Sequence, residues 1–329
     1  MRESLLDRLV CPECHQPLEC RPAEVAPDGD IVSGDLRCTG CAERYRIANG
    51  IPRFVPAENY GASFGYQWNK FRREQIDSLQ GIQQSERRLR TETAWEPEWL
   101  RGKWILDAGC GAGRFLEVTS RTEGCEAVGV DISGAVDAVK ETLDGRTNAH
   151  LVQASIFKLP FRPGAFDGVY CIGVIQHTPD PPSAVRALAR MVRGGGRIAL
   201  TMYERRRFTM LYSKYWVRPL TRRLPQPFLL GLIKVLMPPA FALSEVLFRL
   251  PVVGRAFRFA IPVANYVDDP ELSWRQRYQW AILDTFDMLA PAFDTPQREG
   301  DVVGILTQEG VDGVTRLPNA GLNLIGTKG

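Results

Sequence analysis

The sequence has little net charge and no long uninterrupted apolar run, and both absences narrow the functions it can have. Its 41 lysine and arginine residues nearly balance 38 aspartate and glutamate residues, so a net charge of +3 gives no global argument for binding nucleic acid. The first ten residues lack the long apolar core of a secretory signal, and we expect a cytoplasmic protein. Residues 228–253 are strongly apolar but contain Lys234, Pro238, Pro239 and two further charges, whereas a membrane-spanning helix needs about twenty uninterrupted apolar residues.

Four of the eight cysteines form two CxxC pairs, Cys11 with Cys14 and Cys38 with Cys41, with 23 residues between the pairs. Two such thiolates on a tight turn can bind one ion, and two turns complete a tetrahedral zinc site. The segment has few large apolar residues, so metal binding would supply most of its folding energy. A redox dithiol is the alternative, although it needs only one CxxC pair.

The segments around these pairs, LVCPECHQPLE and DLRCTGCAERYRIANGIPRF, resemble the small zinc-ribbon proteins of the Trm112-like family over residues 5–55. In that family the second CxxC pair is likewise followed by an aromatic-Ile-x-x-Gly-Ile-Pro segment, here Tyr45 to Pro52. The resemblance implies a structural zinc ribbon of a kind that supports or activates methyltransferases.

Glycines recur at residues 109, 111 and 113 in the stretch ILDAGCGAGRF, after a short apolar run that reaches Asp107. An apolar strand, a glycine turn and a helix, here over residues 114–120, is how α/β sheets build a nucleotide pocket at their first βα turn. The dinucleotide fingerprint needs glycine at residue 114, where this chain has arginine. The spacing instead resembles motif I of the class I S-adenosylmethionine (SAM) methyltransferases, with a purely structural turn as the alternative.

A second apolar strand, residues 127–133, reaches Asp131. An acid at this place suits a ribose, because one carboxylate can accept hydrogen bonds from both vicinal hydroxyls. The stretch LVQASIFKLPF (151–161) resembles the methyltransferase segment that binds adenine, but Ser155 stands where the family has an acid. The resemblance implies a SAM site made of Asp107, Gly109, Cys110, Gly111, Gly113, Asp131, Ile132, Ser155 and Ile156.

A buried fourth strand, residues 168–174, leads into Gln176-His177-Thr178. Parallel sheets bind ligands at the carboxyl ends of their strands, so His177 is expected where the chemistry takes place. Oxygen and amine nucleophiles react better once deprotonated, and histidine is the side chain suited to accept that proton near neutral pH. The alternative is that His177 only hydrogen-bonds the loop or the cofactor.

Two segments are expected to shape the acceptor site. Helices are expected over residues 67–79 and 85–94, the second on the surface. The resemblance implies that this segment folds over the cofactor, and Tyr66, Gln67 and Trp68 would either contact the ligands or staple this arm to the core. Residues 204–295 are an insertion whose interleaved basic and apolar residues allow contact with a membrane surface. Apolar helices over 228–253 are expected as its walls. Some of Trp274, Tyr278, Trp280, Asp284 and Asp287 are expected to line the cavity, with Trp274, Tyr278 or Trp280 facing inward and a packed aromatic core as the alternative.

These patterns predict an α/β protein with a Rossmann-like doubly wound sheet. We expect a zinc ribbon over residues 1–57, a helical lead-in over 58–103, a SAM-binding domain over 104–203 and 296–329, and a helical substrate cap over 204–295. The predicted activity is transfer of a methyl group to an oxygen or nitrogen, or a carbon, of a small molecule such as a sugar or specialised metabolite. The alternatives are an rRNA or tRNA methyltransferase and a non-catalytic SAM-binding or activator module.

Overall fold

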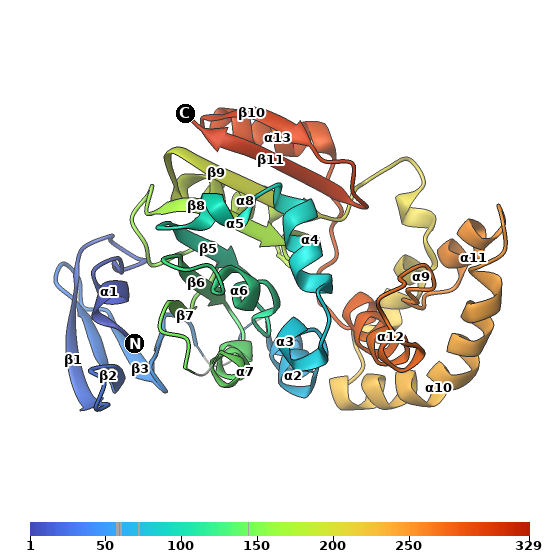
Figure 1. Cartoon of the computed structure of the whole chain (residues 1–329), viewed down its shortest axis with the longest axis horizontal. Helices are drawn as coiled ribbons and strands as arrows, with labels where there is room; N and C mark the ends of the chain where they lie inside the picture. The colour runs from blue at the N-terminus through green and yellow to red at the C-terminus, as the bar shows by residue number, and fades with distance from the viewer. Residues whose placement is uncertain (57–58, 60, 72, 144) are drawn as a thin grey trace.

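The computed structural model describes residues 1–56, 59, 61–71, 73–143 and 145–329. Within them a single mixed sheet runs through the molecule in the strand order β1-β2-β3-β4-β7-β6-β5-β8-β9-β11-β10 (Figure 1). The expected boundary between residues 57 and 58 lies outside the described residues, and the division into domains stays our proposal.

The middle of the sheet is parallel and doubly wound. Its strands are β5 (Trp104–Ala108), β6 (Glu126–Asp131), β7 (Ala149–Gln153), β8 (Phe166–Ile172) and β9 (Val192–Met202). The chain proceeds from β5 through β6 to β7 on one side and then returns to β8 and β9 on the other, so the strand order reverses between β5 and β8. Such a switch point opens a crevice at the carboxyl ends of the strands, where α/β proteins bind ligands.

Helices cover both faces of these strands. One face carries α8 (Pro181–Met191) and α13 (Glu299–Gln308), whose apolar residues pack in the core with those of β6 and β9. The other carries α6 (Arg114–Thr119) and α7 (Ala135–Thr142). Two antiparallel strands, β11 (Leu322–Lys328) beside β9 and β10 (Val311–Arg316) beside β11, complete this side of the sheet, as the closing segments predict.

The N-terminal segment forms a small antiparallel sheet that is continuous with the large one. After α1 (Glu3–Leu6) come β1 (Leu18–Val25), β2 (Ile31–Cys38), β3 (Arg44–Ala48) and β4 (Ile51–Arg53). β4 lies parallel to β7, where the Phe54 N–H donates to the Gln153 carbonyl at 2.8 Å. The Arg53 guanidinium also pairs with Asp137 of α7 at 2.6 Å, so the two parts are tied by backbone and side chains.

The lead-in differs from the expected single helix over residues 67–79. The chain forms α2 (Ala62–Phe71), α3 (Asp77–Gln80), α4 (Gln84–Thr93) and α5 (Pro97–Leu100). The Asp77 carboxylate accepts hydrogen bonds from the backbone N–H groups of Ser85 and Glu86 at 3.0 and 2.9 Å, so it caps the first turn of α4. Asp77 could not cap α4 in this way if residues 67–79 formed one continuous helix.

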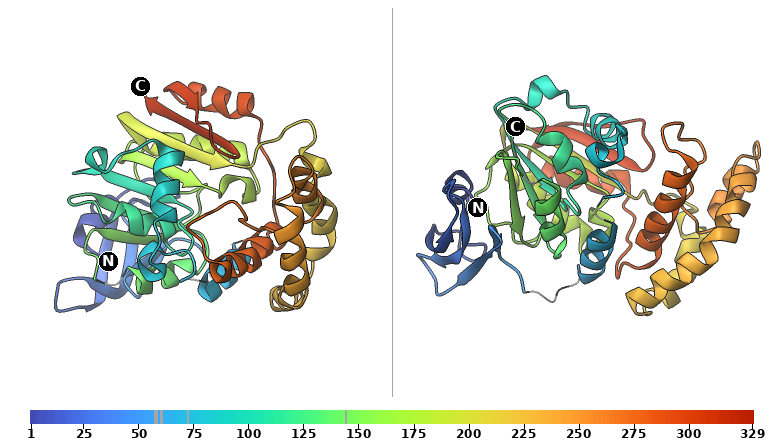
Figure 2. Two further views of the ribbon diagram at one scale, coloured as in Figure 1. Left: turned by 45° about the vertical axis from the view of Figure 1, so that its right-hand side comes forward. Right: turned by 60° about the horizontal axis from the view of Figure 1, so that its bottom comes forward.

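The insertion contains η2 (Thr209–Leu211), α9 (Ser213–Thr221), α10 (Gln226–Leu247), α11 (Gly254–Ala260) and α12 (Trp274–Leu289). α10 is continuous through Pro238 and Pro239. Both prolines are exposed, so the carbonyl groups that lose their helical partners lie on the side that water reaches. Figure 2 shows α10 at the outer end of the molecule.

α10 is the one helix of the described residues whose length and composition would suffice to cross a membrane. Its most apolar window has a mean hydropathy of 1.6, and 33% of that window is buried inside the protein. The buried part packs against α12: Leu229, Ile233 and Phe241 lie in a core cluster with Leu283 and Phe286. One side of α10 is therefore committed to the fold.

Candidate functional site

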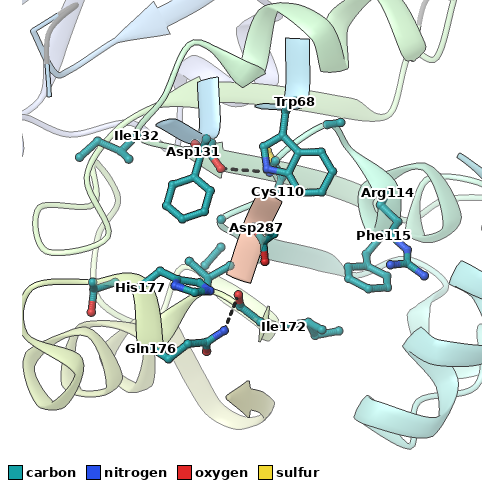
Figure 3. Close-up of a pocket in the computed structure, with 18 of the residues that line it drawn as sticks. Trp68, Cys110, Arg114, Phe115, Asp131, Ile132, Ile172, Gln176, His177 and Asp287 are labelled. Carbon is teal, nitrogen blue, oxygen red and sulfur yellow. Dashed lines mark hydrogen bonds between the residues drawn. The ribbon is translucent and has the colours of Figure 1, made fainter. Parts of the chain in front are cut away.

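A cavity of about 350 Å³ opens at the switch point, at the carboxyl ends of β5, β6 and β8. Figure 3 shows Trp68 entering it from the lead-in, His177 and Gln176 from the loop after β8, and Asp287 from α12. The same cavity thus receives side chains from the sheet, the arm and the insertion.

The glycine loop provides a surface from which side chains are excluded. Gly109 and Gly111 have φ angles of +81° and +53°, which residues with a Cβ rarely adopt. A Cβ on Gly109 would lie 2.5 Å from Val174, and one on Gly111 would lie 3.0 Å from the Trp68 indole. The loop can therefore bring its backbone against a ligand, and the Trp68 indole packs on the loop at Gly111.

Asp131 closes the loop from the adjacent strand. One of its oxygens accepts the Gly111 N–H at 3.0 Å, and the other accepts the Ser133 N–H and hydroxyl at 2.8 and 2.7 Å. Burial raises the pKa of the Asp131 carboxyl, while these three donors oppose that shift. The Oδ2 atom, with a single partner, keeps the capacity to accept a ligand hydroxyl.

Asp107 lies behind the loop and is 2% exposed. Burial raises the pKa of its carboxyl to about 8, and a hydrogen bond from the Tyr170 hydroxyl opposes the shift. Its Oδ2 atom has no hydrogen-bond partner within the described residues. The Asp107 carboxyl therefore lies in the interior beside Tyr170 and not in the cavity lining.

The expected cofactor residues divide into two groups. Those that line the cavity are Gly109, Cys110, Gly111, Asp131, Ile132 and Ile156. Three do not line it: Asp107, Gly113, whose Cβ position points at Val139, and Ser155, whose hydroxyl accepts the Phe157 N–H at 3.3 Å. A glycine cradle beside a carboxylate with spare acceptor capacity fits a nucleoside such as that of SAM.

His177 has a defined orientation in the cavity wall. Its Nδ1 lies 3.0 Å from the Phe293 carbonyl, which can only accept a hydrogen bond, so the proton is assigned to Nδ1. In the neutral ring Nε2 then carries the lone pair, and Nε2 has no partner within the described residues. Phe64 and Tyr203 pack against the ring with centroids 5.5 and 5.6 Å away and hold its plane.

The insertion contributes only some of the residues that the sequence indicates, because its aspartates line the cavity and its aromatic residues do not. Trp280 is 1% exposed and donates its indole N–H to the Glu74 carbonyl at 3.0 Å, while Trp274 and Tyr278 stack on each other beside Phe241. These three aromatic residues, and the residues of α10, are absent from the described cavity lining. The expectation that they form its walls is wrong, because they pack α12 against α10 and the arm instead.

Polar residues of the insertion reach the cavity in their place. Asp284 accepts the Tyr266 hydroxyl and, at 3.4 Å, the Gln75 amide, and Asp287 accepts the Gln67 amide at 3.2 Å. Burial, with the nearby charge of Asp287, raises the pKa of Asp284 to about 6. Trp68 of the arm lines the cavity, whereas Tyr66 packs on Phe286 as the staple alternative predicts.

Arg114 is a cavity residue that the motif does not reveal. It is 7% exposed, donates to Ser85 at 2.9 Å, to Gln75 at 3.3 Å and to Gln84, and forms no ion pair within the described residues. Burial lowers the pKa of its guanidinium to about 10. The sequence does contain a signal for this role, because residue 114 is an arginine at the position where the dinucleotide fingerprint has a glycine.

The four paired cysteines converge on one point. All four Sγ atoms lie within 4.8 Å of one another, with Cys14–Cys38, Cys14–Cys41 and Cys11–Cys41 separations of 3.3, 3.6 and 3.7 Å. Tetrahedral zinc with Zn–S bonds of about 2.3 Å needs sulfur atoms about 3.8 Å apart. The Gly40 N–H donates to Cys38 at 3.3 Å, and the Tyr45 hydroxyl lies 3.2 Å from Cys11. This donor set fits a structural zinc ion.

Comparison with known proteins gives two matching families. Residues 106–200 match the family described as Methyltransferase domain, and residues 2–50 match the family described as Trm112p-like protein. The ubiquinone biosynthesis O-methyltransferase of Sodalis glossinidius (strain morsitans) is 37% identical over 109 residues, which cover 32% of this chain and 43% of that protein. The protein of the same name from Pectobacterium carotovorum subsp. carotovorum (strain PC1) is 32% identical over 123 residues, 33% of this chain and 46% of that one. The chain therefore spans less than half of the length of these two relatives.

Solved structures give distant likenesses. A complex of the Haloferax volcanii Trm112 methyltransferase activator with a methyltransferase aligns at 18% identity and a TM-score of 0.35, over 43% of this chain and 61% of that one. A SAM dependent methyltransferase from Aquifex aeolicus aligns at 14% identity and a TM-score of 0.38, over 72% and 92%. Taken with the cysteine cluster and the glycine loop, the two family matches show that the chain joins a Trm112p-like zinc ribbon to a SAM-dependent methyltransferase domain.

Proposed function

We propose that this protein transfers the methyl group of SAM to an oxygen of a small molecule held in the cavity, with a nitrogen acceptor as the chemical alternative. The single observation that carries the proposal is the orientation of His177, whose unpartnered Nε2 belongs to a cavity-lining side chain. A base in this position can take the proton of an acceptor hydroxyl as that oxygen becomes a nucleophile.

The residues that line the cavity support the same assignment. Its lining includes the glycine loop, Asp131 and Ile156, which suit a nucleoside, and also His177, Tyr203, Asp287 and Met288, which in our proposal face the acceptor. SAM supplies an electrophilic methyl group on a sulfonium sulfur. In our proposal Asp131 holds the ribose, and Arg114, a buried cation whose described side-chain partners are uncharged, holds the methionine carboxylate.

The reaction then depends on what the chain's own residues do. Nδ1 of His177 remains bonded to the Phe293 carbonyl, so proton transfer to Nε2 needs no change of tautomer or ring position. Trp68 covers the loop and limits the access of water. An enclosed site that aligns the acceptor oxygen with the methyl group converts an encounter into an oriented displacement.

The relatives favour oxygen over nitrogen as the acceptor atom. Those quoted above are named as O-methyltransferases of ubiquinone biosynthesis, and each matches about a third of this chain. The residues that would choose the acceptor, Tyr266, Asp284 and Asp287, lie in the insertion, outside residues 106–200 that match the methyltransferase family. We therefore propose the reaction class from the relatives and leave the acceptor to experiment.

The test compares His177→Asn with the wild type. Mass spectrometry of ligands that co-purify with the protein supplies acceptor candidates, and turnover is followed as formation of S-adenosylhomocysteine. We expect turnover to fall by about 10²- to 10⁴-fold while calorimetry gives an unchanged SAM affinity. The control is His15→Asn, an exposed residue of the ribbon with φ of 58°, which asparagine tolerates. Turnover that survives in His177→Asn would show that His177 is not the base.

A further inference from the structure

The charge of the chain is concentrated in one part of the insertion. Residues 205–260 contain eleven arginine and lysine residues and a single acid, Glu245, which gives this segment a charge of +10. The whole chain carries +3, so the remaining residues together carry −7. The near balance of the complete sequence thus conceals a strongly basic segment, and such a segment attracts anionic surfaces.

The longest helix of this segment has two apolar sides. The buried side packs on α12 through residues such as Ile233, Met237 and Phe241. A second series recurs at intervals of three and four residues, which places it on one side of a helix. These residues, the outer stripe of α10, are Phe228, Leu232, Val235, Pro239, Leu243 and Val246, and all six are exposed.

The exposure of this stripe is large for aliphatic side chains. Val235 is 73% exposed and Val246 is 63% exposed, and the neighbouring segments add Trp216 at 70% and Val252 at 91%. Figures 1 and 2 show α9, α10 and α11 together at the end of the molecule farthest from the ribbon. Apolar surface gathered at one end of a protein marks a place where something else is bound.

We propose that the outer stripe of α10 docks on the surface of an anionic phospholipid membrane. Aliphatic and tryptophan side chains would enter the boundary between headgroups and acyl chains, while Arg222, Arg223 and Lys234, all exposed, would meet the phosphate charges. The inference goes beyond methyl transfer and does not depend on which acceptor is used.

Charge and packing favour a membrane surface over a second copy of the chain, RNA or a membrane-spanning arrangement. A second copy of the chain would bring two segments of +10 together, which is unfavourable. RNA would use the arginines but leave the aliphatic stripe in water. A spanning arrangement would pull Ile233 and Phe241 out of their core with α12, so the helix lies on the surface and does not cross the bilayer.

The experiment measures co-sedimentation of the full-length protein with vesicles. One set contains phosphatidylglycerol mixed with phosphatidylcholine, and the other contains phosphatidylcholine alone. We expect binding to the anionic set, at least about tenfold weaker binding to the neutral set, and release by alkaline carbonate. Retention after carbonate treatment would indicate an inserted α10 and would overturn the proposal.

Two double variants test the two components. Val235→Asp with Leu243→Asp removes the apolar component, and Arg222→Ala with Arg223→Ala removes part of the basic one. Each is expected to weaken vesicle binding about tenfold with SAM binding intact. The matched controls are Val25→Asp with Leu79→Asp and Arg21→Ala with Arg44→Ala, exposed residues outside the insertion, for which vesicle binding stays within about twofold.

Three results would contradict the proposal. One is equal vesicle binding by both test variants and the wild type. Another is a dimer, seen by sedimentation equilibrium, that Val235→Asp with Leu243→Asp dissociates. The third is salt-sensitive binding of RNA, with none to anionic vesicles, that Arg222→Ala with Arg223→Ala abolishes. If the aspartate variant fails to fold, the arginine variant and the lipid comparison still decide the matter.

Discussion

Lys214 and Asp294 form a buried ion pair that joins the two ends of the insertion. Nζ of Lys214 lies 2.8 Å from an Asp294 carboxylate oxygen, 80 residues away, and the two side chains are 7% and 1% exposed. The Tyr215 hydroxyl donates to the other carboxylate oxygen at 3.1 Å. Arg218 of the same helix donates to the carbonyls of Met288 and Pro291. Two cations that the sequence places in a basic run are thus anchors of the insertion.

We expect Lys214→Met to destabilise the protein strongly. The change keeps most of the apolar stem but leaves the Asp294 carboxylate buried without its partner, at a cost of about 3–5 kcal/mol. The double variant with Asp294→Asn should recover much of this loss. Denaturant unfolding measures both. The control is Lys158→Met, whose pair with Glu13 is exposed and contributes about 0–1 kcal/mol. Equal effects at the two lysines would contradict the prediction.

The ribbon is expected to hold one zinc ion and to depend on it. Cys38→Ser removes one of four ligands from a segment whose folding is coupled to metal binding, so the N-terminal sheet should unfold. Metal analysis of the pure, reduced protein should give one zinc per chain, and chelation should reproduce the effect of the substitution. Cys20→Ser is the control, because Cys20 lies outside the cluster. A ribbon that survives chelation would refute this.

Asp131→Ala should weaken SAM binding about tenfold or more. The variant loses an acceptor for ligand hydroxyls, each such hydrogen bond contributing about 0.5–1.5 kcal/mol, and it also loses the bond that holds Gly111. Calorimetry measures the affinity, and a melting curve shows whether the fold persists. Asp301→Ala, at an exposed site on α13, is the control. Unchanged SAM affinity, or tighter binding of NAD than of SAM, would contradict the assignment.

The raised pKa of Asp284 predicts that the stability of the protein depends on pH. Its pKa is raised by burial from 3.8 to about 6 in the folded protein, so the native state binds more protons than the unfolded chain between these values. Stability contributed by this group is therefore present at low pH and is lost as the pH rises through about 6. Asp284→Asn should remove the dependence and stabilise the protein at neutral pH by about 1–3 kcal/mol. The test is to measure the free energy of unfolding of both proteins across this pH range, with Asp301→Asn as the control.

Local motifs predict the parts of this protein whose chemistry is complete within a short segment. The cysteine pairs, the glycine loop and the acid at the end of β6 each specify a turn and a ligand type through neighbouring residues. The order of apolar strands then predicts the parallel sheet, because short crossovers leave few topologies. The presence of His177 at the cavity is predicted by its position directly after β8.

The insertion is less predictable because its contacts are long-range. Periodicity alone does not tell which of the two apolar sides of α10 packs against α12. It also does not tell that Pro238 and Pro239 are tolerated within the helix because they lie on its water-exposed side. Nothing local distinguishes Lys214, buried against Asp294, from the exposed Arg205 nearby. The aromatic residues of α12 pack in a core while its aspartates reach the cavity, which is decided by the neighbours of the helix.

The continuity of the ribbon with the large sheet has a consequence for the fate of the metal-free protein. β4 covers the outer side of β7, which without it would be an edge strand with unpaired backbone groups. Exposed edges recruit strands from other molecules and start aggregation. Loss of zinc would therefore expose β7 as an edge strand while the methyltransferase domain stays folded. We expect the metal-free protein to aggregate before it loses the ability to bind SAM.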